Sequence, residues 1–252
     1  MKIIILAAGR GERLMPLTQN TPKPLIDMGN GNTLLEEQMH NIKASGAIDE
    51  IVVVVGYLAE QVDAKISSYR ARGFKVSTVF NPFWQVSNNL MSLWLARQTI
   101  VEGDTVITNG DNIFTPEVFA GLAAQGDGIW LTASPKSDFD PDDMKVTVEK
   151  GLVAHVSKTP TDKAFAESPG LVMVHGERAR GLFLENLEGT VRDLSNINRF
   201  WLEVFNRMWA KGVAVHPWNY DVRGKWQEVD FHLDLKHARK LVEEKAVTFT
   251  RL

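Results

Sequence analysis

Two glycines and two cations stand close together near the N-terminus, in the stretch IIILAAGRGERLMPLTQNTPKPLI (residues 3–26). Gly9 and Gly11 directly follow a run of apolar residues, and Arg13 and Lys23 come after the glycines. Glycines let backbone N–H groups approach a nucleotide closely, and fixed cations attract its phosphates. The pattern therefore predicts a nucleotide-phosphate loop, with a solvated basic loop as the alternative.

Two common phosphate-loop motifs do not fit this stretch. The dinucleotide-binding fingerprint needs a third glycine three positions after the second, and this chain has Leu14 there. The Gly-x-x-x-x-Gly-Lys-Ser/Thr motif needs a Gly-Lys pair, which the stretch lacks. The loop must therefore bind phosphate in another way, if it binds phosphate at all.

Three carboxylates further along the chain could share a cation. Asp111 follows a predicted strand in VITNGDNIF, and Glu228 and Asp230 lie two residues apart in KWQEVDFHLDL. In an extended segment this spacing turns both side chains to one side. Three converging carboxylates would repel each other unless a hard cation such as Mg²⁺ lay among them. Spacing alone does not bring Asp111 to the later pair, and a turn or cap role is the alternative for each.

The elements that must position these residues alternate along the first 130 residues. Buried strands are predicted at 3–6, 51–55, 76–80 and 106–108, and helices at 33–44, 59–71, 90–99 and 116–124. This alternation predicts an α/β fold with a Rossmann-like, mostly parallel sheet and helices on both faces. Asp111 would then lie at the carboxyl edge of the sheet, where such folds bind their ligands.

The second half of the chain has a different pattern. A hairpin is predicted at 145–156, a strand at 171–174, and helices at 200–209 and 233–244. We therefore expect a single domain over 1–252 with three portions. These are a nucleotide-binding core at 1–133, a portion at 134–227 with a small β/α cap, which the family resemblance given below assigns mainly to acceptor binding, and a metal-ligand segment with the closing helix at 228–252.

Composition excludes several classes of protein. The 252 residues carry a net charge of −3 and contain no cysteine, which argues against a nucleic-acid partner and excludes thiolate chemistry. No apolar run reaches the length of a membrane span, and the N-terminus does not fit a signal peptide, so we expect a cytoplasmic protein without membrane insertion. The six histidines are scattered, which disfavours a histidine-based site.

The stretch LAAGRGERLMPLTQNTPKPLIDMG (residues 6–29) closely resembles the signature of nucleotidyltransferases that join an NTP to a sugar phosphate or alcohol phosphate. The resemblance continues through residues 33–57 and implies the GT-A-like fold of that family. It implies nucleotide contacts from Leu6, Ala7, Ala8, Gly9 and Gly11. It also implies that Arg13 and Lys23 are catalytic, binding phosphate oxygens as pyrophosphate departs, and that Asp111, Glu228 and Asp230 hold Mg²⁺, with Asp111 also at the nucleotide.

A second stretch resembles one branch of that family. Asn88, Asn89 and Ser92, in NPFWQVSNNLMSLWLAR, look like the corresponding positions of phosphocholine and phosphonate cytidylyltransferases. Amide and hydroxyl groups at a helix start suit the edge of a pyrimidine, which favours CTP over UTP or dTTP. Ser87 or Asn88 could also cap the helix, and both roles are compatible.

The acceptor side also resembles that branch. Lys145 and Lys158 lie on the predicted hairpin and would bind the acceptor's phosphate or phosphonate, with Lys158 also at the α-phosphate as a catalytic residue. Glu167 lies in a segment that weakly resembles an acceptor site. A choline acceptor would need an aromatic cage, but Met144 stands where some choline enzymes have tryptophan, and Trp201 has core-like spacing.

The sequence therefore predicts a Mg²⁺-dependent cytidylyltransferase whose partners are CTP and a small acceptor resembling phosphocholine or 2-aminoethylphosphonate. A sugar-1-phosphate nucleotidylyltransferase using UTP or dTTP is the alternative within the enzyme class. A non-catalytic nucleotide-binding homologue is the alternative outside it. A homodimer is compatible with the sequence.

Overall fold

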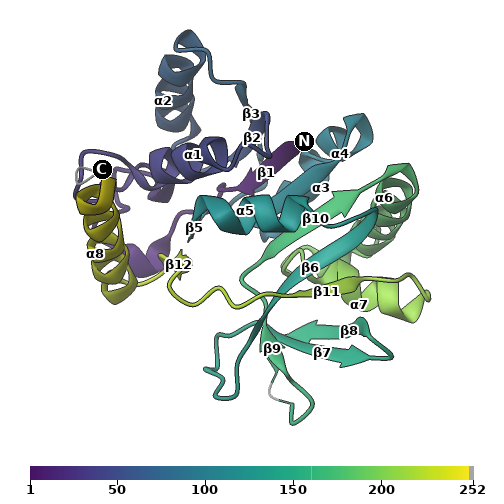
Figure 1. The fold of residues 1–252 in the computed structure, drawn as a ribbon. Coiled ribbons are helices and arrows are strands. Elements are labelled where there is room, and N and C mark those ends of the chain that lie inside the picture. Colours follow the sequence, from purple (N-terminus) through teal and green to yellow (C-terminus); the bar gives the residue numbers. More distant parts are fainter. Residues whose placement is uncertain (160, 250–252) are drawn as a thin grey trace.

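Four parallel strands form the first half of the central sheet in Figure 1, a computed structural model that describes residues 1–159 and 161–249, with side chains through 243. Their order is β3 (Val76–Phe80), β2 (Glu50–Val55), β1 (Lys2–Leu6) and β4 (Thr105–Asn109). β1 lies between β2 and β4, and its three isoleucines are fully buried, as expected of a central strand that is covered on both faces. The loop after β1 therefore starts from the middle of the sheet's carboxyl edge.

The second half of the sheet is mixed. β10 (Leu171–His175) runs antiparallel between β4 and β6 (Gly128–Pro135), and β11 (His216–Asn219) lies parallel to β6. The hairpin of β7 (Lys145–Glu149) and β8 (Leu152–Ser157) joins through β9 (Ala166–Glu167). These late strands extend the same sheet that the N-terminal strands begin.

A short ribbon stands apart from the main sheet. β5 (Asn112–Phe114) pairs antiparallel with β12 (Trp226–Glu228), so that Glu228 lies opposite Asn112. The backbone N–H of Val229 donates to the carbonyl oxygen of Asp111 at 2.9 Å. This pairing brings the late acidic segment beside Asp111.

Helices cover both faces of the sheet (Figure 1). Ile3 and Ile5 pack with α1 (Leu34–Ala44), α2 (Ala59–Ala71) and α5 (Pro116–Ala123). Ile4 and Leu6 point to the opposite face, as alternate strand residues must. They pack with the helices α3 (Asn89–Leu95), α4 (Gln98–Glu102), α6 (Glu177–Val191) and α7 (Glu203–Ala210). The closing helix α8 (His232–Phe249) packs in a smaller cluster with Leu14, Ile26 and Met28.

The predicted α/β fold is confirmed, and some element predictions need correction. The helix predicted at 90–99 is two helices, since α3 ends at Leu95 and α4 begins at Gln98. The helix predicted at 200–209 begins only at Glu203. The sequence pattern does not predict the strand β6 or the helix α6. Helix α6 contains Gly189, which weakens the helical pattern but leaves room for Arg207: an added Cβ there would lie 2.3 Å from the Arg207 guanidinium.

None of the helices in the described part of the chain is long and apolar enough to cross a membrane. The predicted cytoplasmic location, the homodimer and the three-portion division of the domain stay predictions.

Candidate active site

A cleft of about 460 Å³ opens at the carboxyl ends of β1 and β4 and reaches the β7–β8 side of the molecule. Fifteen of the sixteen site residues predicted from sequence line it: Leu6, Ala7, Ala8, Gly9, Gly11, Arg13, Lys23, Asn88, Asn89, Ser92, Asp111, Lys158, Glu167, Glu228 and Asp230. Lys145 is the exception. The fold therefore gathers residues from the whole chain at one place.

The glycine loop turns back on itself so that Lys23 enters the cleft. Gly11 has a φ of 68°, and a Cβ there would lie 3.0 Å from the Cβ of Lys23. The Thr18 hydroxyl donates to the carbonyl oxygen of Gly11 at 2.8 Å. Glycine is thus required both for the backbone conformation and for the close approach of the lysine.

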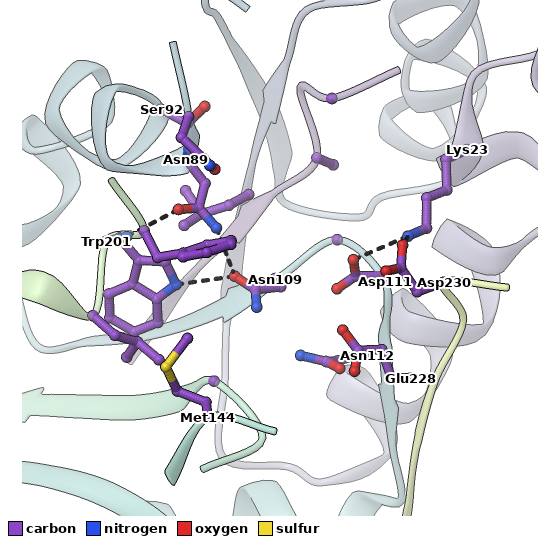
Figure 2. Close-up of a pocket in the computed structure, with 18 of the residues that line it drawn as sticks. Lys23, Asn89, Ser92, Asn109, Asp111, Asn112, Met144, Trp201, Glu228 and Asp230 are labelled. Atoms are coloured by element: carbon purple, nitrogen blue, oxygen red, sulfur yellow. Dashed lines mark hydrogen bonds and ion pairs between the residues drawn. The ribbon is translucent and has the colours of Figure 1, made fainter. Parts of the chain in front are cut away.

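Lys23 lies between two of the predicted metal ligands (Figure 2). Its Nζ is 3.0 Å from Asp111 Oδ2 and 3.0 Å from Asp230 Oδ1. Arg13 also pairs with Asp230. Burial disfavours the charged form of Lys23, but the two carboxylates outweigh it and raise the pKa of the lysine. Both loop cations are therefore held by carboxylates in this structure.

The carboxylates still exceed the charge that Lys23 and Arg13 neutralise. Glu228 is open to solvent on the cleft side, yet desolvation by its surroundings, together with Asp111 and Asp230, raises its pKa to about 8. Asp111 Oδ1 is buried and has no hydrogen-bond partner within the described residues. A buried oxygen without a donor and a repelled carboxylate are both relieved by a cation.

These residues fit a hard divalent cation by their chemistry. Asp111, Glu228 and Asp230 supply only oxygen donors, which Mg²⁺ prefers. Within the described residues no group of three or more acidic or histidine side chains has the arrangement of a metal site. Lys23 lies between Asp111 and Asp230 in this structure. The three metal ligands therefore stay a prediction.

The turn that carries Asp111 is packed tightly against β1. A Cβ on Gly110 would lie 2.6 Å from the Cβ of Ala7 and 2.9 Å from the carbonyl oxygen of Leu6. Gln38 on α1 donates to the carbonyl oxygen of Asn112 at 2.8 Å. The turn is thus fixed by a glycine that allows close approach and by a side chain from the helix layer.

The polar residues of α3 lie along another side of the cleft. Asn88 caps the helix, because its side-chain oxygen accepts from the backbone N–H of Asn89 at 2.7 Å. The Ser92 hydroxyl accepts from the Asn81 amide at 3.0 Å. The cap predicted at Ser87 or Asn88 is therefore Asn88. Its capping role is compatible with the proposed nucleotide role, which stays a prediction.

The predicted acceptor side of the cleft contains paired charges. Lys158 Nζ lies 3.1 Å from Asp142 Oδ1 and 5.0 Å from the centre of the Phe200 ring. Glu167 lies 3.1 Å from Lys136; burial raises the pKa of this glutamate despite that lysine. Both Lys158 and Glu167 face the cleft, so they are available to a ligand there.

The structure does not bring Lys145 into the cleft. Its side chain is buried, and its ammonium donates to the carbonyl oxygens of Asp140, Asp143 and Lys158 at 2.8, 3.1 and 3.1 Å. A buried ammonium needs such acceptors. Lys145 therefore supports the loop around it, and the predicted acceptor contact does not follow from its position.

Sequence reasoning missed several residues that line the cleft, among them Asn81, Asn109, Asn112 and Phe200. Trp201 is fully buried, as its core-like spacing predicts, and it also borders the cleft. The signal that could have identified Asn109 and Asn112 is their place on either side of Gly110 and Asp111.

Residues 2–126, about half of the chain, match the family model described as nucleotidyl transferase. This half of the chain belongs to the nucleotidyl transferase family. The fold resemblance extends further. The solved structure of CTP:phosphocholine cytidylyltransferase from Streptococcus pneumoniae aligns with a TM-score of 0.71 at 23% identity, over 96% of this chain and 98% of that one. The nucleotidyl transferase fold expected from the N-terminal stretch is thereby confirmed.

Curated relatives of this nucleotidyl transferase domain include two named enzymes. Choline-phosphate cytidylyltransferase of Streptococcus pneumoniae is 39% identical over 119 residues, 47% of this chain and 48% of that protein. CMP-5'-(3-aminopropyl)phosphonate synthase of Streptomyces rubellomurinus is 29% identical over 247 residues, 94% of this chain and 38% of that protein. The aligned stretches thus span about half, or less, of the curated relatives' own length.

Proposed function

We propose that the protein is a Mg²⁺-dependent cytidylyltransferase that transfers CMP from CTP to a phosphate or phosphonate oxygen of a small acceptor. The observation that carries this proposal is that the glycine loop, the two loop cations, the three carboxylates, Lys158 and Glu167 all line the same cleft. Its glycine loop, two cations and three carboxylates suit a nucleotide with its metal, and its far side leads to Lys158 and Glu167.

Nucleotide binding would change the partners of the loop cations. Lys23 and Arg13 each hold a carboxylate, and a triphosphate in the cleft offers both of them phosphate oxygens instead. Asp111, Glu228 and Asp230 would then hold Mg²⁺, which supplies charge neutralisation at the phosphates when it is bound. Gly9 and Gly11 allow the backbone to approach those phosphates.

The reaction is a single in-line displacement. An oxygen of the acceptor's phosphate or phosphonate attacks the α-phosphorus, and the bond from that phosphorus to pyrophosphate breaks. The attacking oxygen is already ionised near neutral pH, so no general base is required. Lys23, Arg13 and Lys158 act by position and charge. In keeping with this, no histidine lines the cleft in the described part of the chain.

The choice of CTP rests on residues of the cleft, and the choice of a charged acceptor rests on the named relatives. Asn88, Asn89 and Ser92 give amide and hydroxyl groups suited to a pyrimidine edge. The names of the two curated relatives include a choline phosphate and an aminopropylphosphonate, both with a cationic end. We therefore propose a phosphocholine-like or 2-aminoethylphosphonate-like acceptor.

The test measures pyrophosphate release with Mg²⁺. CTP, UTP, dTTP, ATP and GTP are each combined with phosphocholine, 2-aminoethylphosphonate, inositol phosphate and glucose-1-phosphate. Turnover with CTP and phosphocholine or 2-aminoethylphosphonate is expected, and turnover with CTP and inositol phosphate alone would support the cytidylyltransferase but contradict the proposed acceptor. Turnover only with UTP or dTTP and glucose-1-phosphate would instead indicate a sugar-1-phosphate nucleotidylyltransferase. Nucleotide binding without turnover on any acceptor would indicate a non-catalytic homologue.

A further inference from the structure

Asn109 connects parts of the cleft that come from distant regions of the chain. It is the last residue of β4 and stands two residues before Asp111. Its Oδ1 accepts from the indole Nε1–H of Trp201 at 2.9 Å and from the Asn89 amide at 3.4 Å (Figure 2). One side-chain oxygen thus joins the turn that carries Asp111 to α3 and to the segment before α7.

The segment of residues 193–202, here named the strap, is held through its backbone by residues at the start of α3. The backbone N–H of Asn88 donates to the carbonyl oxygen of Ile197 at 2.9 Å. The backbone N–H of Trp201 donates to Asn89 Oδ1, also at 2.9 Å. The Asn89 side chain is predicted to contact the base of the nucleotide. Its Oδ1 already accepts a hydrogen bond from the strap, so this oxygen also holds the strap in place.

The strap forms a wall of the cleft through Phe200 and Trp201. Trp201 is fully buried, and its ring packs 5.9 Å from that of Phe205 in the core. A buried indole N–H needs an acceptor, and Asn109 is the one it has. Loss of this acceptor would leave a donor unsatisfied inside the wall, and the ring would have to move to find another.

Asn109 also lies against the acceptor-side segment. Gly170 has a φ of 68°, and a Cβ there would lie 2.8 Å from Asn109 Nδ2. The neighbouring Asn112 donates to the carbonyl oxygen of Pro169 at 2.8 Å. The two asparagines that flank Gly110 and Asp111 therefore both reach the segment that contains Glu167.

We propose that Asn109 is a positioning residue that holds the acceptor-side wall, through Trp201, in register with the turn that carries Asp111. This role rests on the proposed function, because it concerns how the acceptor is placed against the nucleotide. The residue acts through Trp201, so its loss would displace the wall, which would then bind the acceptor more weakly and hold it less accurately for in-line attack.

The first experiment compares N109A with N206A. Asn206 is a matched control, since its side chain also bridges two elements, accepting from Val156 N–H at 2.9 Å and donating to its carbonyl at 3.1 Å, outside the cleft. We expect N109A to raise KM for 2-aminoethylphosphonate or phosphocholine by about tenfold or more, with the Kd for CTP changed less than about twofold. The proposal would be overturned if N109A and N206A raised the acceptor KM equally. It would also be overturned if N109A weakened CTP binding as much as it raised the acceptor KM.

A second experiment does not depend on turnover. In an indole ¹⁵N–¹H spectrum the Trp201 signal is identified by its loss in W201F, and it should shift in N109A but keep its place in N206A. W201F removes the donor while keeping an aromatic ring, so the same rise in acceptor KM is expected there. N109A should then add little in the W201F background, because the two act as a pair.

These readouts separate two kinds of failure. If the wild-type protein transfers no CMP to any acceptor, the proposed function fails, while the indole signal still tests the link from Asn109 to Trp201. If the protein is active but the Trp201 signal is unmoved in N109A, or the two substitutions are additive, the positioning role is wrong.

Discussion

Single residues at the glycine-loop end of the cleft carry opposing charges. Lys23 and Arg13 provide two positive charges against Asp111, Glu228 and Asp230. Desolvation, followed by repulsion from Asp111 and Asp230, raises the pKa of Glu228 to about 8, and this crowding of carboxylates suits a site that would gain a cation when a nucleotide binds.

Replacing Asp111 by asparagine tests this arrangement. With CTP and Mg²⁺, D111N should lower turnover by at least about 100-fold, because a charged oxygen ligand is lost where charge develops. The free energy of unfolding should change much less, because Lys23 loses its ion pair with Asp111 but keeps its contact with Asp230 at 3.0 Å. Activity assays and urea titration measure the two effects. D162N, on an exposed loop, is the control; unimpaired turnover in D111N would refute a metal role for Asp111.

The neighbouring Gly110 allows a second test. In G110A the new methyl group would meet Ala7 and Leu6 at 2.6 to 2.9 Å, so the turn must move and carry Asp111 with it. We expect the protein to lose about 1–3 kcal/mol of stability and turnover to fall more than nucleotide affinity. In G126A an added Cβ meets nothing within 4 Å, and that variant should behave like wild type. Equal activity in both variants would contradict the tight packing of the turn.

At this scale the sequence predicts residue types better than their contacts. The N-terminal loop residues were predicted because their motif is contiguous. The contact of Lys23 with Asp230 spans 207 positions, and nothing local signals it. Lys145 and Asn89 show that a suitable residue type at a plausible position need not be free to bind a ligand. Lys145 donates to three backbone carbonyl oxygens, and Asn89 Oδ1 accepts from the backbone N–H of Trp201.

At the scale of elements, Glu36 fixes α1 at its start and to α2. Its carboxylate accepts from the backbone N–H and hydroxyl of Thr33, both at 2.8 Å, in a capping box. Tyr69 and Lys65 on α2 donate to it at 2.9 and 3.2 Å. Burial opposes ionisation, but these donors outweigh it and lower the pKa of Glu36 to about 2.

The substitution E36Q should therefore destabilise the protein by about 2 kcal/mol near neutral pH. Because the pKa is lower in the folded state than its ordinary value of 4.5, the stabilisation is complete above about pH 4.5 and disappears as pH falls toward 2. The stability difference between wild type and E36Q should shrink over that interval in urea titrations. E60Q, on the exposed side of α2, should have little effect. A difference independent of pH would show that the charge is not the cause.

Element prediction succeeded where periodicity was strong and failed where tertiary packing decides. The apolar runs of β1, β2 and β4 and the capping box of α1 are local signals. The break between α3 and α4 has no Gly or Pro to mark it: Ala96 and Arg97 are good helix formers. α6 was missed because Gly181 and Gly189 weaken its helical pattern, and Gly189 is needed for the approach of Arg207.

At the scale of the whole molecule, the two halves of the chain share one sheet. β10, from the second half, pairs with β4 of the first half, and its residues enter both main cores. Val172 and Val174 pack on one face with Ile4, and Met173 packs on the other with Ile3. The core therefore has no break near residue 133, where the predicted nucleotide-binding and acceptor-binding portions meet.

Unfolding should consequently be a single cooperative transition, and M173A tests this. Met173 is fully buried and pairs with Val106 on one side and Trp130 on the other. Its truncation should cost about 2–5 kcal/mol. Circular dichroism and tryptophan fluorescence should report the same shifted midpoint in urea, since both halves lose the same strand contact. V101A, at a position 53% exposed, should change stability by less than about 0.5 kcal/mol. Separate midpoints for the two probes in M173A would mean that the first and second halves of the chain unfold independently. The sheet would then not hold the two sides of the cleft rigidly together.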